Sequence, residues 1–272
     1  MLKQRVITAL VLLPIVVWCV FFAPSIWAFR IFAAAIVAVA AWEWTAMMGW
    51  KAPALRAVYA AAVLASLVVL ALQADILKVA QLPLLGVAVL FWLIAHRLVR
   101  AYPAGTDGWA NTAMLAPLGF VLLVPAWLGL VLLHGLSAWW LMYLFVLVWG
   151  ADTGAYFAGR AFGKHKLAPS VSPGKTLEGF FGGLLLTMTV AVAVALYRDL
   201  AGQRFWAFLL LSLLTVLASV LGDLFESMVK RHAGIKDSGT IFPGHGGALD
   251  RIDSLTAAAP VFALGWLLAQ GF

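Results

Sequence analysis

The stretch that decides the fold runs from Met114 to Leu133, MLAPLGFVLLVPAWLGLVLL, and contains no charged residue. A helix of that length covers about 30 Å, the thickness of the hydrocarbon core of a bilayer. Comparable apolar runs recur along the chain, and the expected spans are 5–23, 27–47, 57–73, 79–95, 114–133, 138–158, 179–197, 205–222 and 255–271. The pattern predicts an all-α, polytopic integral membrane protein with about nine transmembrane helices.

The composition leaves little chain for any aqueous domain. Of 272 residues, 65% are hydrophobic and 11% are charged, and the mean hydropathy is +1.03. These values exclude a disordered, collagen-like or disulfide-rich secreted protein, and the lone Cys19 lies in the first apolar run. We expect a single transmembrane domain over 1–272, with N-terminal helices in 5–134 and, in 138–272, the helices and loops that carry the polar motifs described below.

The net charge of +7 is explained by membrane topology. The cations are scattered in pairs between apolar runs and form no basic face, so we expect no nucleic-acid partner. If the N-terminus is cytoplasmic, fourteen of the eighteen Lys and Arg residues fall in inside segments, and only Lys78, Arg198 and Arg204 fall outside. This asymmetry predicts a multi-pass protein of the cell (inner) membrane with a cytoplasmic N-terminus.

The carboxylates are concentrated in the C-terminal half. Eight of the eleven acidic residues lie from Asp152 to Asp253, and seven of the eight are at or just beyond cytoplasmic ends of apolar runs. Because a carboxylate within the bilayer costs about 2.5–3.5 kcal/mol, the pattern favours a polar functional site at the cytoplasmic side. For any single one of these carboxylates, the alternative is that it only keeps a surface loop soluble.

The first polar cluster follows the apolar run 138–148. Asp152 and Tyr156 share a helix face at i and i+4, and Gly150, Gly154 and Gly159 permit close backbone approach. A helix interface of small residues, in which Asp152 has only a structural role, is the alternative interpretation.

A basic loop follows this helix. It contains Lys175 among hydroxyls and glycines, which suit phosphate groups, but a P-loop is excluded because Pro169 stands where that motif needs glycine. Residues 170–178 are expected to begin a helix, with Thr176 as its cap and Glu178 in its first turn. A merely solvated inside loop would have the same composition.

The second polar cluster surrounds the last two apolar runs. Asp223, Glu226, Ser227 and Lys230 stand at i, i+3, i+4 and i+7 and therefore form one stripe of a helix. Asp250 and Asp253 share a helix face in the same way. Together with Asp223 they offer the hard oxygen ligands that Mg²⁺ prefers.

Cations and glycines accompany these carboxylates. Four cations would neutralise phosphates, namely Lys230, Arg231, Lys236 and Arg251. Gly244, Gly246 and Gly247 permit a tight turn around His245 with exposed backbone amides. His245 has no second ligand at zinc spacing and could contact a phosphate, act as an acid or hold the turn. A chance salt-bridged loop is the alternative for the whole cluster.

These motifs resemble a known family. The residues 227–231, 236–237, 243–247 and 250–254 resemble the signature of phosphatidate cytidylyltransferases, also called CDP-diglyceride synthases. The segments 152–156 and 172–179 are similar to the same family, so the resemblance covers Trp149 to Leu255 closely. Ala248 departs from the larger aliphatic residue usual there, which affects packing and not the chemistry.

The resemblance implies that CTP and phosphatidic acid are converted to CDP-diacylglycerol and pyrophosphate at the cytoplasmic face of the membrane. It implies Mg²⁺ dependence and a homodimer, and it leaves open whether a second, monovalent cation joins the site. Metal ligands are expected to be Asp223, Asp250 and Asp253, and these with Lys230 and His245 are the expected catalytic residues. The expected substrate-binding residues are Lys175, Ser227, Arg231, Lys236, Asp237, Gly246, Gly247, Arg251, Asp152 and Tyr156.

Two other classes of protein fit the sequence less well. A polytopic transporter would place ionisable groups near the bilayer midplane, whereas these gather at one surface. Another membrane phosphotransferase of the CDP-alcohol type would follow an Asp-Gly pair with spaced aspartates, and Asp107-Gly108 is the only such pair here and lacks them. The role of Glu43, flanked by two tryptophans, is open between aiding a headgroup site and pairing with a cation.

Overall fold

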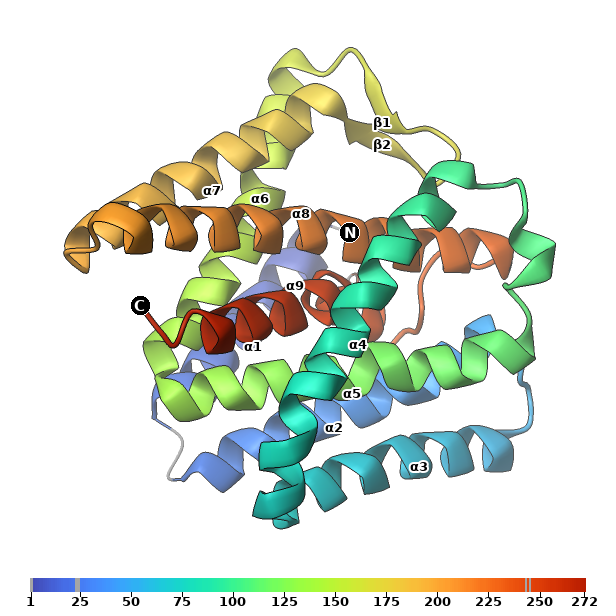
Figure 1. The fold of residues 1–272 in the computed structure, drawn as a ribbon. Helices are drawn as coiled ribbons and strands as arrows, with labels where there is room; N and C mark the ends of the chain where they lie inside the picture. The colour runs from blue at the N-terminus through green and yellow to red at the C-terminus, as the bar shows by residue number, and fades with distance from the viewer. Residues whose placement is uncertain (1, 23–24, 243, 245) are drawn as a thin grey trace.

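The computed structural model of this chain describes residues 2–22, 25–242, 244 and 246–272 (Figure 1). Nine long helices and one short 3-10 helix form within these residues. The long helices are α1 (Leu2–Phe21), α2 (Ile26–Met47), α3 (Pro53–Leu72), α4 (Ala74–Ala101), α5 (Thr112–Leu136), α6 (Ala138–Phe162), α7 (Leu177–Tyr197), α8 (Gly202–His232) and α9 (Leu249–Leu268), and the short one is η1 (Thr106–Gly108). Each expected apolar run coincides with one long helix, which confirms the largely helical fold.

Seven helices of the described chain, α2 to α8, are long and apolar enough to cross a membrane. The chain is therefore an integral membrane protein. Neither α1 nor α9 is among the seven, so the number of nine spans stays a prediction. In α9 the charged residues Asp250, Arg251 and Asp253 lie near the start of the helix and lower its hydropathy.

Helix α9 lies in the middle of the fold, where it packs against α2, α4, α5, α6 and α8 (Figure 1). All its residues from Ser254 to Pro260 are buried. A helix that is surrounded by other helices has no large surface toward lipid. Small side chains let the neighbouring backbones approach it closely. Gly129 of α5 makes one such close contact, because a Cβ there would lie 2.7 Å from the carbonyl oxygen of Ala259. This packing holds the start of α9 in a defined position.

The all-α class is confirmed, with a short exception between α6 and α7. There β1 (Lys166–Ala168) and β2 (Ser172–Thr176) form an antiparallel hairpin. Pro173 cannot donate a backbone hydrogen bond, and Gly174 is about 1 kcal/mol less favourable than Ala in a helix. The segment expected to begin a helix is therefore extended.

The predicted start of the following helix is confirmed. Thr176 is the N-cap of α7, and its Oγ1 accepts a hydrogen bond of 3.1 Å from the backbone N–H of Gly179. Glu178 lies in the first turn and accepts hydrogen bonds from the backbone N–H groups of Lys164 and His165. Glu178 thus ties the start of α7 to the segment between α6 and β1.

Glycines bring α6 and α7 together, as the spacing of Gly150, Gly154 and Gly159 predicts. A Cβ at Gly154 would lie 2.8 Å from the carbonyl oxygen of Gly182 and from the Cα of Gly183. The two backbones therefore touch, as small residues allow in membrane helix pairs. This contact anchors the hairpin beside the end of α6.

Candidate active site

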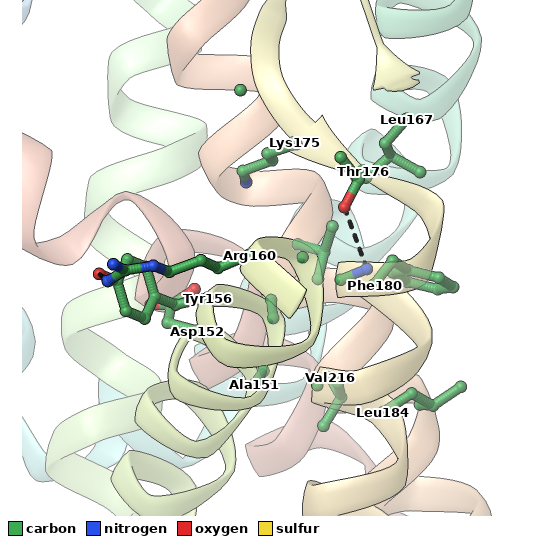
Figure 2. A pocket seen from close by; sticks show the side chains of 16 residues that line it. Ala151, Asp152, Tyr156, Arg160, Leu167, Lys175, Thr176, Phe180, Leu184 and Val216 are labelled. Carbon is green, nitrogen blue, oxygen red and sulfur yellow. Dashed lines mark hydrogen bonds between the residues drawn. The ribbon is translucent and has the colours of Figure 1, made fainter. Parts of the chain in front are cut away.

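A cavity of about 400 Å³ lies between α6, β2, α7 and α8 (Figure 2). Val216 and Val220 of α8 form part of its apolar wall. In Figure 2 the side chains of Asp152, Tyr156 and Arg160 project from α6. The polar residues that line the cavity are Asp152, Tyr156, Arg160, Lys175 and Thr176. The first polar cluster and the basic loop are therefore parts of one site.

Lys175 joins the hairpin to α8 at this cavity. Its ammonium nitrogen lies 2.6 Å from Oδ2 of Asp223, and the two side chains are 28% and 25% exposed. An ion pair this accessible contributes about 0–1 kcal/mol to stability. Oδ1 of Asp223 also accepts a 3.3 Å hydrogen bond from the hydroxyl of Ser227, so these residues share one face of α8 as predicted. The charges remain available to a ligand.

Asp152 belongs to the same charged group. Its carboxylate is exposed and interacts electrostatically with Asp223, Lys175 and Arg251. Tyr156, one turn further along α6, accepts a 3.1 Å hydrogen bond from Arg160 Nη1. The cavity therefore combines carboxylates from α6 and α8 with cations from three segments of the chain.

Behind this accessible group lies a buried ion cluster around Lys230. The ammonium nitrogen of Lys230 is 2.9 Å from Oε2 of Glu226 and 2.5 Å from Oδ1 of Asp250. All three residues are less than a tenth exposed. A buried ion pair is costly to break, because the remaining charge loses its partner. Lys230 therefore locks α8 to the start of α9.

The second oxygen of Asp250 is also committed. Oδ2 accepts hydrogen bonds of 2.9 Å and 2.8 Å from the backbone N–H groups of Ser238 and Gly247. Burial acts to raise the pKa of Asp250, which lies outside the seven candidate spans, but hydrogen bonds from Lys230, Gly247 and Ser238 outweigh it and lower the pKa. Asp250 is therefore ionised at neutral pH and holds the loop before α9.

Glu43 of α2 holds the same loop from the other side. Its carboxylate accepts hydrogen bonds from the backbone N–H groups of Ala248 and Leu249, at 3.1 Å and 2.8 Å, and from the hydroxyl of Ser238 at 3.1 Å. Glu43 is only 4% exposed. A carboxylate at a helix N-terminus accepts hydrogen bonds from the free N–H groups there. Its negative charge is also attracted to the positive end of the helix dipole. Glu43 thus caps α9 and neither lines the cavity nor forms an ion pair in the described chain.

Glycine is required where this loop meets the two carboxylates. A Cβ at Gly239 or Gly247 would overlap the carboxylate of Glu43, and one at Gly246 would overlap that of Asp250. Gly246 also has φ +79°, a conformation that side chains disfavour. Of the glycines predicted to expose backbone amides, Gly247 donates its N–H to Asp250.

Asp253 lies one turn after Asp250 and meets Glu226 across the contact of α8 and α9. Oε1 of Glu226 is buried without a hydrogen-bond partner in the described residues. Burial, with the negative charges of Asp223 and Glu226, raises the pKa of Asp253, which also lies outside the seven candidate spans. Three carboxylates are thus crowded together without enough cations between them.

This crowding is chemically suited to a divalent ion with oxygen ligands, which would relieve the repulsion. Asp223 and Asp253 supply such oxygens, and Glu226 supplies one without a partner. Asp250 differs from Asp223, because its oxygens are buried and are bound by Lys230 and backbone amides, whereas Asp223 is a quarter exposed and is bound only by side chains. Among the described residues no three His, Cys, Asp or Glu side chains are arranged as a ready set of ligands.

The remaining predicted residues lie around this centre. Arg231, Lys236, Asp237 and Arg251 are exposed, and Gly246 pairs through its backbone with Phe242. His245 lies outside the described residues. Sequence reasoning did not assign roles to Ser238 and Arg160, and it left Glu43 undecided. Glu43 is the only carboxylate in the apolar span 27–47, and this isolation was the one feature of the sequence that could have indicated a specific role.

The fold and the site define a class: an integral membrane protein of apolar helices with a cluster of carboxylates and cations between α6, α8, α9 and a short hairpin. The sequence pattern of the Cytidylyltransferase family matches residues 3–268, so the chain belongs to that family.

Two curated relatives match over almost the whole chain, and a third matches over about half of it. The chain is 47% identical over 279 residues to the phosphatidate cytidylyltransferase of Pseudomonas aeruginosa, covering 100% of this chain and 99% of that protein. It is 43% identical over 287 residues to the protein of that name from Haemophilus influenzae, covering 97% and 98%. A phosphatidate cytidylyltransferase of Staphylococcus epidermidis is 48% identical over 131 residues, or 48% of this chain and 49% of that protein.

Proposed function

We propose that the chain transfers the cytidylyl group of CTP to phosphatidic acid and so forms CDP-diacylglycerol and pyrophosphate. The observation that carries this proposal is the accessible pair of Lys175 and Asp223 in a cavity at the end of apolar helices. Both substrates are polyanions and one is a lipid, so they need cations beside a membrane. The full-length relatives named phosphatidate cytidylyltransferase support the same reaction.

The proposed reaction is a direct displacement at phosphorus. An oxygen of the phosphatidate phosphate attacks the α-phosphorus of CTP, a new P–O bond forms, and pyrophosphate leaves with the electron pair of the broken bond. A phosphate monoester is already largely ionised near neutral pH, so no strong general base is needed. The main tasks of the protein are alignment and neutralisation of charge.

The exposed cations of the site carry out these tasks. Lys175 exchanges its contact with Asp223 for a substrate phosphate, and Arg251, on the exposed side of α9, neutralises charge beside Asp152. Further phosphate and nucleotide contacts are proposed for Ser227, Arg231, Lys236, Asp237, Gly246, Gly247, Asp152 and Tyr156. His245 is proposed as a catalytic residue from its motif alone.

Lys230 and Asp250 have a second role in this proposal. Because Lys230 is buried between Glu226 and Asp250, it orients these carboxylates and keeps the loop before α9 in place. Its charge also contributes to the positive field of the site. Lys230 is thus proposed to assist catalysis through Asp250.

Mg²⁺ is the proposed cofactor, held by Asp223, Asp250 and Asp253. The crowded oxygens of Asp223 and Asp253 support this ligand set, and Asp250, which is paired with Lys230 here, would be its third member by motif. When bound, the ion supplies positive charge that stabilises the transition state and the leaving pyrophosphate. A second, monovalent cation beside Mg²⁺ is an option that rests on the family resemblance alone.

The membrane arrangement is part of the proposal. The excess of Lys and Arg in alternate loops supports a cytoplasmic N-terminus, nine spans and an active site on the cytoplasmic face of the inner membrane. A homodimer is proposed from the family resemblance.

One assay tests the reaction. Purified protein in detergent receives phosphatidic acid, Mg²⁺ and CTP labelled at the α-phosphate. We expect the label to enter the lipid fraction, with one pyrophosphate released for each labelled lipid. CTP labelled at the γ-phosphate should label only pyrophosphate, and lipid without a free phosphate monoester, such as phosphatidylglycerol, should accept nothing. Absence of labelled lipid from phosphatidic acid would refute the proposed function.

A further inference from the structure

A second cavity, of about 810 Å³, lies between α4 and α8. We name it the α4–α8 groove, and it is lined by apolar side chains that include Val89, Leu93 and Val99 of α4 and Leu214, Leu217 and Leu221 of α8. Its volume lies within the range of about 300–1,000 Å³ found for ligand pockets. The groove is therefore large enough for a ligand and offers that ligand an apolar wall.

The polar residues of the groove are concentrated toward one end. His96 and Arg100 lie in the last two turns of α4, and Ser170 lies in the turn of the hairpin. Figure 1 shows the end of α4 beside β1 and β2. No acidic side chain is among the groove residues of the described chain. A ligand with an apolar body and an anionic end matches this distribution of charge.

The groove and the active-site cavity share a wall. Leu167 of β1, Phe180 of α7 and Val220 of α8 line both. Lys175 and Asp152 line only the active-site cavity, on the other side of these three residues. The groove is therefore adjacent to the cavity that contains Lys175.

We infer that the α4–α8 groove binds a fatty acyl chain of the lipid substrate and so aligns its phosphate with the bound nucleotide. The inference rests on the proposed function and identifies a site for its lipid. A nucleotide does not fit the groove, because the apolar wall leaves its polar atoms without partners. An acyl chain gains little from leaving the bilayer, which is equally apolar, so the groove acts through shape and alignment.

The test fills the groove and compares lipids of different chain length. Leu93 lines the groove, whereas Leu90, also an exposed leucine of α4, does not. Leu93→Trp should lower kcat/KM for dioleoyl phosphatidic acid by about fivefold or more, because a bulky ring occupies the space of the chain. It should change kcat/KM for dihexanoyl phosphatidic acid and KM for CTP by less than about twofold, because neither needs the groove. Leu90→Trp is the matched control and should leave all three values unchanged.

Leu217→Trp fills the groove from the opposite wall and repeats the test if Leu93→Trp folds poorly. Equal effects of groove and control variants, or equal loss with both lipids, would overturn the inference. Failure of the proposed function has a different signature, since the wild-type protein would then label neither lipid.

Discussion

The carboxylate of Glu43 accepts a 2.8 Å hydrogen bond from the backbone N–H of Leu249, which lies 206 residues further along the chain. Through this contact α2 holds the first turn of α9, which carries Asp250 and is followed directly by Asp253. Ser238 donates its hydroxyl to the same carboxylate and its backbone N–H to Asp250. The N-terminal half of the chain therefore sets the position of the loop that carries the C-terminal motifs.

We expect Glu43→Gln to lower both stability and turnover. The amide keeps the size of the side chain but replaces one acceptor oxygen by a donor, which faces the N–H groups of Ala248 or Leu249. Leaving a buried donor unsatisfied costs about 1–3 kcal/mol. Thermal unfolding in detergent should report this loss, and kcat should fall more than KM for CTP changes, because the loop and Asp250 shift together.

Thr45→Val is the control for Glu43→Gln. It removes another buried polar group of α2, which accepts a 2.8 Å hydrogen bond from Arg56 and does not contact the loop before α9. It should lower the melting temperature with kcat nearly unchanged. Wild-type kcat and melting temperature in Glu43→Gln would show that the cap has no such role.

Gly247→Ala tests the packing of the loop itself. The added methyl group would overlap the Glu43 carboxylate and the Ser238 hydroxyl, which are both held by hydrogen bonds. Overpacking of this kind costs about 1–3 kcal/mol. The measurement is the melting temperature together with the transfer rate, and both should fall. Gly86→Ala in α4, where nothing lies within 4 Å, should lower neither value, and a neutral Gly247→Ala would contradict the described loop.

Periodicity predicts those parts of the site that lie on one helix. The spacing of Asp223 and Ser227 placed them on one face of α8, and they share a hydrogen bond. The cap at Thr176 and the glycine contacts of α6 follow from local rules of the same kind. Residues separated by one or two turns can be paired from sequence alone because helix geometry sets their distance.

Contacts between distant segments are not encoded in such patterns. Nothing near Glu43 in the sequence identifies Leu249 as its partner, because that contact exists only after α2, α9 and the intervening helices have packed. Lys230 and Asp250 likewise lie in motifs that are typical of phosphate binding and metal binding. In this structure, however, their side chains bind each other. The hairpin was not predicted, because Pro173 and Gly174 are the only residues of the segment 170–178 that strongly disfavour a helix.

Asp223→Asn and Asp250→Asn should both abolish transfer but differ in stability. Asp223 is a quarter exposed, so its loss should change the free energy of unfolding by less than about 1 kcal/mol. Asp250 accepts hydrogen bonds from Lys230, Ser238 and Gly247, and its loss should cost about 1–3 kcal/mol. Melting temperatures and CTP-dependent labelling of lipid separate the two effects. Full activity in Asp223→Asn would remove that residue from the site, and equal melting temperatures would contradict the buried cluster.

Lys230→Ala and Lys175→Ala form a matched pair of lysine variants. Lys230→Ala leaves Glu226 and Asp250 buried without their cation, which should cost about 3–5 kcal/mol. Lys175→Ala removes an accessible charge, so we expect a raised KM for CTP or phosphatidic acid and little change in melting temperature. Titrations of both substrates and thermal unfolding should be measured in parallel. The roles assigned to these lysines are wrong if the two variants show the reverse pattern.

Removal and return of Mg²⁺ tests the proposed ligands both by activity and by direct measurement of binding. EDTA should abolish transfer, and titration calorimetry should show Mg²⁺ binding to the wild-type protein with nucleotide present. Asp223→Asn and Asp253→Asn should each weaken that binding by about tenfold or more, because each removes an oxygen from the crowded group. Asp250→Asn should weaken it less, since Lys230 and two backbone amides compete with the ion for its oxygens. Asp199→Asn, an exposed change between α7 and α8, is the control and should bind as the wild type does. Unaltered affinity in both Asp223→Asn and Asp253→Asn would place the ion elsewhere, and the crowding of these carboxylates would then need another explanation.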